Sequence, residues 1–509
     1  MENTVLGSGA GPVSAEGGAH ADAGRLFRGS CVALVATSMA FAVVTAIMLD
    51  LKSEFGLSNF EVGLIAGAAT WGFAVSQLVF APLCDPLGMR FLVRLAFLCH
   101  LVGAAFLLTG LNFWTLFAGA LVLALANGLV EAACNPLVAA LYPDQKTVRL
   151  NQFHVWFPGG IVIGGLLSYG LGEVGLTEWR LKVALLFIPT LVYGAMILRR
   201  TFPPTEGVRQ GVSMGEMFRA TLTTPLMLLL LVCMAVTAST ELGPGRWVTP
   251  VLEAGGLPGI LVLVWINGIM AVLRYKAGFA VKRLSPPGVL AASSAVAFVG
   301  LFWLSYAESL ATALMSATVF AIGVCYFWPT MLGYVSEHVP KSGALGLGLM
   351  GAVGMAVVGL VTTPEMGRIA DRVGHDQLPV AETAALLADA ADQLPAAATA
   401  PTGAVAAEAG SGGQDQDAAA ASDAARAALA SYEETGELPV MVTAAALRSI
   451  QAASPASELA GRAGAVLGPA DNYGGRVSFR YLLPFTGALI VVFGLLYVRT
   501  RAAPGVAPS

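Results

Sequence analysis

Apolar residues along the chain gather in blocks of about 20, separated by short stretches rich in Gly, Pro and charged residues. A helix of about 20 apolar residues spans the hydrocarbon core of a bilayer. The blocks predict twelve membrane-spanning helices, over residues 29–50, 60–81, 91–110, 113–141, 150–172, 180–198, 222–241, 256–274, 287–306, 309–335, 342–364 and 479–499. The pattern therefore indicates an all-α integral membrane protein.

Two segments interrupt this regular spacing. Residues 200–221 are polar and divide the helices six and six, whereas residues 365–478, rich in Ala, Gly, Asp and Glu, precede the last helix. In this insertion we expect short helices joined by flexible Gly-rich linkers, serving either as a plain loop or as a lid or partner-binding segment. The predicted organisation is a tail (1–28), a six-helix bundle (29–199), a linker (200–221), five helices of a second bundle (222–364), the insertion (365–478), a twelfth helix (479–499) and a second tail (500–509).

The two predicted halves resemble each other in sequence. "NPLVAALYPDQKTVRLN" follows the fourth helix and "WPTMLGYVSEHVPKSGA" follows the tenth, with Pro136 and Pro329 each eight residues before an acid, Asp144 or Glu337. Two pseudo-symmetric six-helix halves with a site between them near the midplane are typical of secondary transporters.

The positions of the Lys and Arg residues predict the orientation of the chain in the membrane. If residues 1–28 are cytoplasmic, most of the cations are cytoplasmic too, and the short outer loops hold only Lys52, Arg180, Lys182 and Arg246. Cations are retained on the cytoplasmic side, so we expect both termini there, in the inner (plasma) membrane. The first 24 residues contain no apolar stretch, which argues against a cleaved signal peptide.

Composition excludes several classes of protein. Only 12% of the residues are charged and 56% are hydrophobic, and no G-x-x-x-x-G-K-[ST] motif is present, so we expect no nucleic-acid partner, no nucleotide site and no enzyme activity. The six cysteines have neither metal-ligand spacing nor a disulfide framework. The expected partners are a small solute, protons and the lipid bilayer, bound by a monomer without metal or cofactor.

A polar stripe interrupts the fourth predicted helix. Asn127, Glu131 and Asn135 are spaced i, i+4, i+8 and share one face. Glu131 lies about 16 Å below the cytoplasmic helix end, close to the midplane, because a helix rises 1.5 Å per residue. A charge there costs at least ~2.5 kcal/mol, so the carboxyl either carries protons or is a structural acid bonded to a neighbouring helix.

Other polar residues in or near the helices are candidates for the same site. Asp50 ends the first helix, where it would be either a second carboxyl of the site or an interfacial residue. Asn151, His154 and Trp156 lie on the fifth helix. His154 could bind the solute, relay a proton or form a hydrogen bond between helices. Asn267, Tyr326 and Trp328 add amide and aromatic surface, which suits sugar rings but also occurs in any packed bundle.

The seventh helix ends in the segment "TASTELGPGRWVTP". The Gly-Pro-Gly sequence either breaks the helix at a central cavity, where Glu241 and Trp247 would contact the solute, or marks an ordinary helix end with an interfacial Trp.

The loop after the second helix, "APLCDPLGMR", resembles the signature G-x-L-x-D-R-x-G-R-R of the major facilitator superfamily. Asp85, Gly88 and Arg90 match it, whereas positions 81, 86 and 89 depart from it. The resemblance covers all twelve helices but not the insertion. It implies that this conformational loop stabilises an outward-facing state through a charge relay.

Within that superfamily, "VEAACNPLVAALYP" resembles the E-x-x-x-N-P pattern of the fucose permease branch of sugar/proton symporters, with Glu131, Asn135 and Pro136 in register. By this resemblance Asp50 would be a protonated carboxylate, and Glu131 would contact the sugar and couple it to the proton. The expectation is proton-coupled import of a small polar solute such as a monosaccharide. The alternatives are proton-driven efflux of drugs or organic acids and a non-transporting sensor or scaffold.

Overall fold

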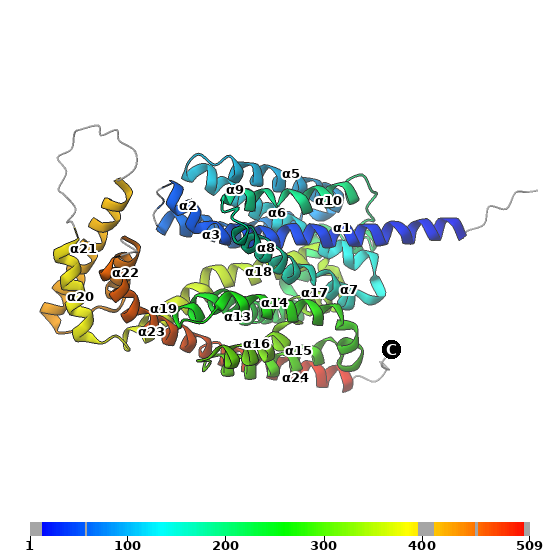
Figure 1. The fold of residues 1–509 in the computed structure, drawn as a ribbon. Coiled ribbons are helices and arrows are strands. Elements are labelled where there is room, and N and C mark those ends of the chain that lie inside the picture. The colour runs from blue at the N-terminus through cyan, green and yellow to red at the C-terminus, as the bar shows by residue number, and fades with distance from the viewer. Residues whose placement is uncertain (1–12, 56, 58, 395–411, 454–456, 503–509) are drawn as a thin grey trace, which may run out of the picture.

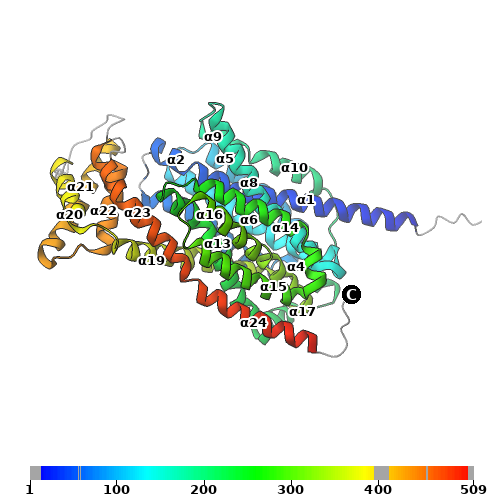
Figure 2. The same ribbon diagram turned by 60° about the horizontal axis from the view of Figure 1, so that its bottom comes forward.

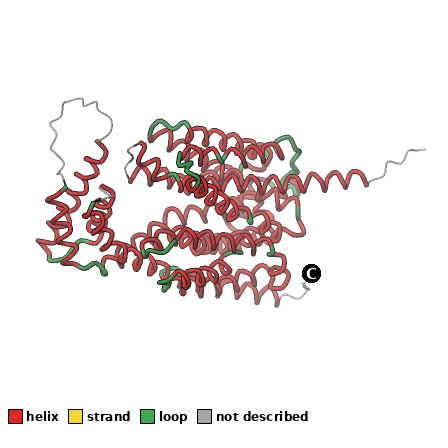
Figure 3. Tube along the Cα trace, viewed as in Figure 1, coloured by secondary structure: helices red, strands yellow, loops and turns green. Residues whose placement is uncertain are grey.

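The structure, a computed structural model, describes residues 13–55, 57, 59–394, 412–453 and 457–502, and every regular element within them is a helix (Figure 3). Most helices run side by side in one bundle (Figure 1). The beginning of α1 (Val13–Ala46) and the C-terminus lie at one end, here called the tail side, and a cluster of further helices projects from the other, here called the insertion side (Figure 1).

The first half of the bundle contains the helices up to residue 197. They are α1, α2 (Met48–Phe55), α3 (Asn59–Phe80), α4 (Cys84–Leu87), α5 (Met89–Leu108), α6 (Phe113–Leu141), η1 (Pro143–Gln145), α7 (Lys146–Phe153), α8 (Trp156–Glu173), α9 (Trp179–Ala184) and α10 (Phe187–Ile197). The predicted linker 200–221 holds the short α11 (Glu206–Arg209) and most of α12 (Met214–Thr223).

The second half repeats this arrangement. Its elements are α13 (Pro225–Ala254), α14 (Gly259–Tyr275), α15 (Ala277–Leu304), α16 (Leu310–Val324), α17 (Phe327–His338), η2 (Pro340–Ser342), α18 (Gly343–Val357), the π-helical η3 (Val358–Thr362), α19 (Thr363–His375), α23 (Glu458–Arg480) and α24 (Leu483–Ala502). In the described residues, ten helices are long and apolar enough to cross a membrane, and the two shorter apolar helices Leu64–Phe80 and Gly259–Tyr275 complete the predicted set.

The structure relates the two halves by a sequence separation that differs from the one between the two prolines. The difference is about one helical turn. The fourth and tenth membrane helices begin at equivalent capping boxes, at Asn112 and Ser309, and end at equivalent backbone angles, φ −132° at Tyr142 and φ −129° at Val339. Asn112 and Ser309 are as far apart in the sequence as Tyr142 and Val339. Pro136 and Pro329, which suggested the repeat, are four residues off this register, because a proline can occupy different turns of equivalent helices.

The same separation holds in helices three and nine. A Cβ on Gly103 would lie 2.8 Å from the backbone nitrogen of Leu123, and one on Gly300 would lie 2.3 Å from that of Phe320. At each position, the missing side chain lets two backbones approach closely. The helix pairs α5–α6 and α15–α16 therefore pack in equivalent ways in the two halves.

The conformational loop also has an equivalent in the second half. Gly88 (φ 80°, ψ 144°) corresponds to Ser285 (φ 56°, ψ 162°), which divides α15 into two helical parts. The part before Ser285 follows α14 after a short break at Lys276. Helical structure thus continues beyond the predicted end of the eighth membrane helix at Arg274, which lies in the last turn of α14.

The predicted discontinuity in the seventh helix is wrong. α13 continues through Gly243, Pro244 and Gly245 to Ala254, which also excludes the alternative that the helix ends there. Proline removes only one backbone hydrogen bond, and the bare Gly243 lets α13 pack closely on η3, where a Cβ would lie 2.9 Å from Thr362.

The interruptions lie in other helices. The fifth membrane helix breaks between α7 and α8 at His154 and Val155, and the tenth breaks between α16 and α17 at Cys325 and Tyr326. The eleventh contains the π-helical segment η3. These breaks free backbone carbonyls inside the bundle, as described below.

The insertion contains short helices, as expected, whereas residues 395–411, which include the start of its Gly-rich segment, lie outside the described residues. Its described helices α20 (Val380–Gln393), α21 (Gly412–Thr435) and α22 (Val440–Ala453) pack with α23 around a shared apolar core. Ala421, Ala425 and Ala428 are buried in this core and recur at i, i+4, i+7, so one face of α21 can approach its neighbours closely. Figure 2 shows α23 leading from this cluster into α24 along the side of the second half.

Candidate functional site

Glu131 lies deep inside the bundle. Every residue of α6 from Ala126 to Ala140 is buried, and the Glu131 side chain is 2% exposed. The carboxyl lies ten residues, or about 15 Å, from the tail-side end of α6 at Leu141. The predicted depth therefore agrees with the structure.

Glu131 is the first member of a short hydrogen-bonded chain. The Nδ2 atom of Asn135 donates to Oε2 of Glu131 at 3.1 Å. The Oδ1 atom of Asn135 is 3.0 Å from Nε2 of His154, at the break in the fifth helix. Since an amide oxygen only accepts, His154 donates through Nε2. Two residues of the predicted stripe and the predicted histidine thus form one chain.

This chain directs the second histidine nitrogen toward the carboxyl. Nδ1 of His154 is 4.0 Å from Oε1 of Glu131. In a neutral imidazole protonated at Nε2, Nδ1 carries a lone pair, so it faces a carboxylate that carries lone pairs as well. A proton on either group removes this repulsion. The arrangement suits a proton held by Glu131 or shared with His154.

A buried ion pair from the second half faces this chain. Nη2 of Arg274 in α14 lies 2.7 Å from Oε1 of Glu241 in α13, and the two side chains are 2% and 5% exposed. A buried charge is tolerated only when it is paired and its remaining donors are satisfied. Glu241 was predicted as a solute contact, whereas Arg274 was not predicted for the site.

The helix breaks supply the other partners of Arg274. Its Nε donates to the carbonyl of Cys325 at 2.6 Å, and its Nη1 donates to the carbonyl of His154 at 3.1 Å. Both carbonyls lie where a membrane helix is interrupted, so they lack a regular helical partner. One guanidinium thus joins a carboxylate of the second half to the backbone of both halves.

These groups line a small central cavity. Its volume is about 20 Å³, room for about one water molecule. The lining residues are Phe73, Glu131, His154, Phe157, Glu241, Leu242, Arg274, Trp328 and Met355. Since this space is too small for a sugar, the described conformation is closed around the site.

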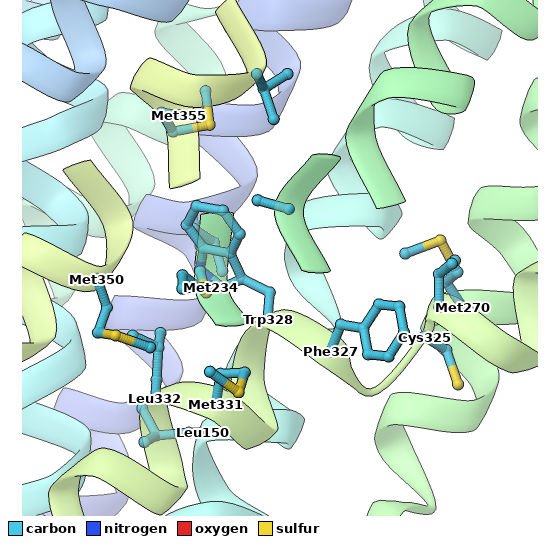
Figure 4. Packing of buried hydrophobic residues seen from close by; sticks show 14 of the residues in the cluster. Leu150, Met234, Met270, Cys325, Phe327, Trp328, Met331, Leu332, Met350 and Met355 are labelled. Atoms are coloured by element: carbon cyan, nitrogen blue, oxygen red, sulfur yellow. The ribbon is translucent and has the colours of Figure 1, made fainter. Parts of the chain in front are cut away.

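Several buried polar atoms at the cavity have no hydrogen-bond partner among the described residues. They are Oε2 of Glu241 and Nε1 of Trp328, and both amide atoms of Gln77, which lies behind the cavity lining, lack a partner as well. Gln77 and Trp328 lie beside the carboxyl of Glu131. Figure 4 shows the Trp328 ring pointing toward Met355, on the opposite side of the α17 start from Phe327. An unpaired buried polar group is costly, so these atoms are suited to bind a solute.

Asn127, the third member of the predicted stripe, belongs to a separate network. Its Oδ1 is 3.0 Å from Nε2 of His100, and Nδ1 of that histidine is 2.9 Å from the hydroxyl of Tyr193. All three side chains are buried within the first half. Asn127 therefore faces α5 rather than the cavity.

The predicted aromatic and amide residues mostly lie outside the cavity lining. Trp156 is 41% exposed, and the Nδ2 of Asn267 bonds to its own helix at the carbonyl of Leu263. Tyr326 donates to the carbonyl of Leu273 at 3.1 Å, which braces the helix next to Arg274. Trp247 lies nearer the insertion side.

Asp50 also lies outside the cavity lining. Its Oδ2 is 3.0 Å from Nζ of Lys182, and its side chain is 37% exposed. It lies in α2, beyond the insertion-side end of α1.

The conformational loop adopts only part of the predicted arrangement. Asp85 accepts a hydrogen bond from the hydroxyl of Thr205 in the linker at 2.6 Å. Arg90 has no ion pair among the described residues, and its Nε is buried without a partner there. Gly88 is in the left-handed region, which favours glycine.

The two halves are joined on the tail side of the cavity. Nζ of Lys146 donates to the carbonyl of Ser336 at 3.2 Å, and the hydroxyl of Thr147 donates to Glu337 at 2.7 Å. Both bonds connect α7 to α17. These contacts close the path between the cavity and the tail side.

Asn151, a predicted solute contact, contributes to the same closure. Its Nδ2 donates to the hydroxyl of Thr330 at 3.1 Å and to the carbonyl of Thr147. Its amide therefore bridges the halves in this conformation.

The sequence analysis missed Arg274, Gln77 and the apolar lining residues. The signal for Arg274 was the continuation "RYKAGFAVKRL", which keeps a helical pattern beyond the predicted end of the eighth helix. Gln77 lies in an otherwise apolar stretch of the second helix and has a polarity as unusual there as that of Glu131. The aromatic and Met lining residues have no distinguishing sequence signal.

Solved structures resemble this fold over most of the chain. The fucose:proton symporter of E. coli aligns with a TM-score of 0.55 and 18% identity, over 68% of this chain and 92% of the symporter chain. A bacterial homologue of the human lysosomal transporter Spinster aligns with a TM-score of 0.56 and 14% identity, over 95% and 99% of the two chains. At these identities the likeness concerns the fold.

Curated relatives match a shorter part. A hexose transporter of Saccharomyces cerevisiae is 31% identical over 144 residues, 27% of this chain and 25% of the transporter. A D-xylose transporter of Levilactobacillus brevis is 25% identical over 159 residues, 31% of this chain and 35% of that protein. The chain thus spans a quarter to about a third of the length of these relatives.

A family model covers much more of the chain. Residues 30–363 match the model described as Major Facilitator Superfamily. This segment includes the first half from residue 30 on, the linker and the second half through η3, with every residue that lines the central cavity. The chain is therefore a multi-pass, non-enzymatic transporter that belongs to the Major Facilitator Superfamily.

Proposed function

We propose that this transporter imports a small polar solute, with a monosaccharide as the best candidate, together with a proton. The observation that carries the proposal is the buried chain of Glu131, Asn135 and His154 at the cavity. An intramembrane ionisable residue is expected to be functional. The hexose, xylose and fucose transporters among the similar proteins favour a sugar.

The cavity walls have the chemistry that a sugar requires. Phe73, Phe157 and Trp328 offer apolar ring faces, and Glu241 offers a carboxylate oxygen that has no partner among the described residues. Sugars stack their C–H faces on aromatic rings and use their hydroxyls as both donors and acceptors. The halves would have to separate to admit the solute, because the closed cavity is too small for it.

Alternating access supplies this separation. The two halves rock about the central site, and each conformation opens it to one side of the membrane. Opening toward the tail side would break the Thr147–Glu337 and Lys146–Ser336 bonds. A proton on Glu131 lowers the cost of moving the loaded site through a closed state, since it removes a buried charge.

The proposed orientation has the tail side in the cytoplasm and the insertion side outside the cell membrane. It rests on the Lys and Arg distribution, with both termini cytoplasmic. Import then means entry from the insertion side. Asp50, at that end, is a second candidate proton carrier, and it pairs with Lys182 in the closed state.

The decisive experiment replaces Glu131 by Gln, which keeps the shape and can still accept from Asn135. In proteoliposomes we expect sugar-driven proton uptake to fall at least ~100-fold, the lower limit typical of losing a proton-transfer group. Exchange of labelled for unlabelled sugar should persist, because it needs no net proton movement. Unchanged proton uptake would contradict the coupling role.

Glu382→Gln is the matched control, since Glu382 is an exposed acid of α20 outside the bundle. Its proton uptake should equal that of the unaltered protein. The solutes to compare are D-glucose, D-xylose, L-fucose and L-lactate.

Lactate tests the second candidate function, transport of an organic acid. The specific observation in its favour is Arg274, whose guanidinium lines the cavity. A carboxylate solute could take the place of Glu241 on Arg274 once Glu241 is protonated. Proton-linked movement of lactate but of none of the three sugars would favour this function over sugar import.

A further inference from the structure

A second and larger cavity lies on the insertion side. Its volume is about 250 Å³, close to the lower end of the ~300–1,000 Å³ range of small-molecule pockets. α13, α19, α22 and α23 supply its walls, and the lining residues are Trp247, Pro250, Val251, Ala254, Ala370, Asp371, Arg448 and Asp471. The cavity thus forms where the insertion meets the bundle.

One wall of this cavity is polar, and only some of its hydrogen-bonding groups are paired with one another. Nη2 of Arg448, from the insertion helix α22, bonds to Oδ1 of Asp371 at 2.6 Å and to Oδ1 of Asp471 at 2.8 Å. The other oxygen of each carboxylate, and the Nε and Nη1 of Arg448, have no hydrogen bond to any described residue. The wall therefore presents free acceptors beside free donors.

The facing wall is apolar and fixed in place. Trp247 comes first along α13, Pro250 and Val251 lie one turn later, and Ala254 lies one turn after them. The indole N–H of Trp247 donates to the carbonyl of Thr363 at 3.3 Å, and a Cβ on Gly367 would lie 3.0 Å from the ring. The ring is thus held by α19.

The two walls together match one class of ligand. A small polyol can lay its C–H face against an aromatic and aliphatic surface while its hydroxyls bond to carboxylates and guanidinium. An anion would meet two carboxylates. A bare cation would leave the donors of Arg448 unused and would gain little from the apolar wall.

We propose that this cavity is a second solute site, which binds a monosaccharide-sized polyol on the insertion side. The choice of a sugar rests on the proposed function, whereas the site itself rests on the cavity and its two walls. One helix connects the two sites, because α13 carries Glu241 at the central cavity and Trp247 at this second cavity. It gives the insertion a role, since Arg448 comes from α22.

The test measures equilibrium binding of labelled D-glucose, D-xylose and L-fucose to the purified full-length protein. In the double variant Asp371→Asn/Asp471→Asn, each free carboxylate oxygen can be replaced by an amide donor. We expect two sites per chain in the unaltered protein, and in the variant one of them weakened at least ~10-fold, as when a site loses hydrogen-bond partners for a hydroxyl. Equal binding by both proteins would overturn the proposal.

A matched control and a filling variant separate binding from folding. Asp389→Asn alters another Asp–Arg pair of the insertion, with Arg462, which does not line the cavity. It should keep both sites. Ala254→Phe should block the cavity without touching its charges, and should lose the same site as the double Asp variant. Two sites in an Ala254→Phe protein with unchanged melting temperature would contradict the proposal.

Trp247 provides an independent signal. Sugar binding at either site should change tryptophan fluorescence, and Trp247→Phe should remove the part of the change that the double Asp variant also loses. The same fluorescence response to KCl, without a response to sugar, would show a cation site and overturn the proposal. If the second site binds sugar but the unaltered protein moves none in proteoliposomes, the proposed transport function fails and the second site stands.

Discussion

The two halves of the bundle share a backbone but differ in the chemistry they bring to the cavity. The separation that relates Asn112 to Ser309 also relates Glu131 to Trp328, so an acid in the fourth helix corresponds to an indole in the tenth. Both line the cavity. The first half thus supplies a carboxyl group where the second supplies an aromatic surface.

The crossings between the halves show the same contrast. Gln77 on α3 meets α18 at Gly351, where a Cβ would lie 2.0 Å from the Gln77 amide oxygen. At the equivalent crossing, Arg274 on α14 reaches the backbone carbonyl of His154. One crossing holds an unpaired amide and the other a fully engaged guanidinium. Repetition of a fold therefore fixes where side chains meet but not what they do.

The largest expected effect is at Arg274. Arg274→Met leaves Glu241 buried without its cation and removes two bonds to backbone carbonyls. Breaking a buried pair in this way costs about 3–5 kcal/mol. We expect a lower melting temperature in detergent and loss of solute uptake.

The control for Arg274→Met removes both charges. Arg274→Met/Glu241→Met should regain much of the melting temperature, because no unpaired charge remains, but should not regain uptake. Equal melting temperatures of the single and double variants would show that the pair is not the source of the loss.

A smaller effect is expected at the equivalent position in the first half. Gln77→Leu replaces an amide that has no partner among the described residues, so stability should change by less than ~1 kcal/mol. If Gln77 contacts the solute, the KM for uptake should rise about 10-fold, the loss of roughly 1.4 kcal/mol of binding. An unchanged KM would remove Gln77 from the solute site.

Substitutions at the equivalent positions Gly88 and Ser285 should change the stability of the protein in opposite directions. Gly88→Ala forces a side chain into the left-handed region and should destabilise the protein by about 1 kcal/mol. Ser285→Gly should stabilise it by a similar or smaller amount, because serine already occupies that region. Thermal unfolding of the two variants tests the assignment, and shifts of the same sign would argue against it.

The smallest effect is expected at Asp50. Its bridge to Lys182 is partly exposed, so Asp50→Asn should cost less than ~1 kcal/mol of stability. We expect proton uptake to fall less than in Glu131→Gln. A loss as large as that of Glu131→Gln would instead make Asp50 a second proton carrier.

The sequence by itself determined the features that depend on local geometry. Hydrophobic length gave the membrane helices, and i, i+4 spacing gave the bond between Glu131 and Asn135, because residues four apart share a helix face. The capping residues that begin the fourth and tenth helices are local as well. The fold class and the family follow from such features.

Only the tertiary structure decided which helices meet at the cavity and with which side chains. The bond from Asn135 to His154, the pairing of Arg274 with Glu241 and the turning of Asn127 toward His100 all join different helices. The packing of the insertion helices around one apolar core also joins different helices. Such contacts depend on how helices rotate and cross, which periodicity along one helix does not encode.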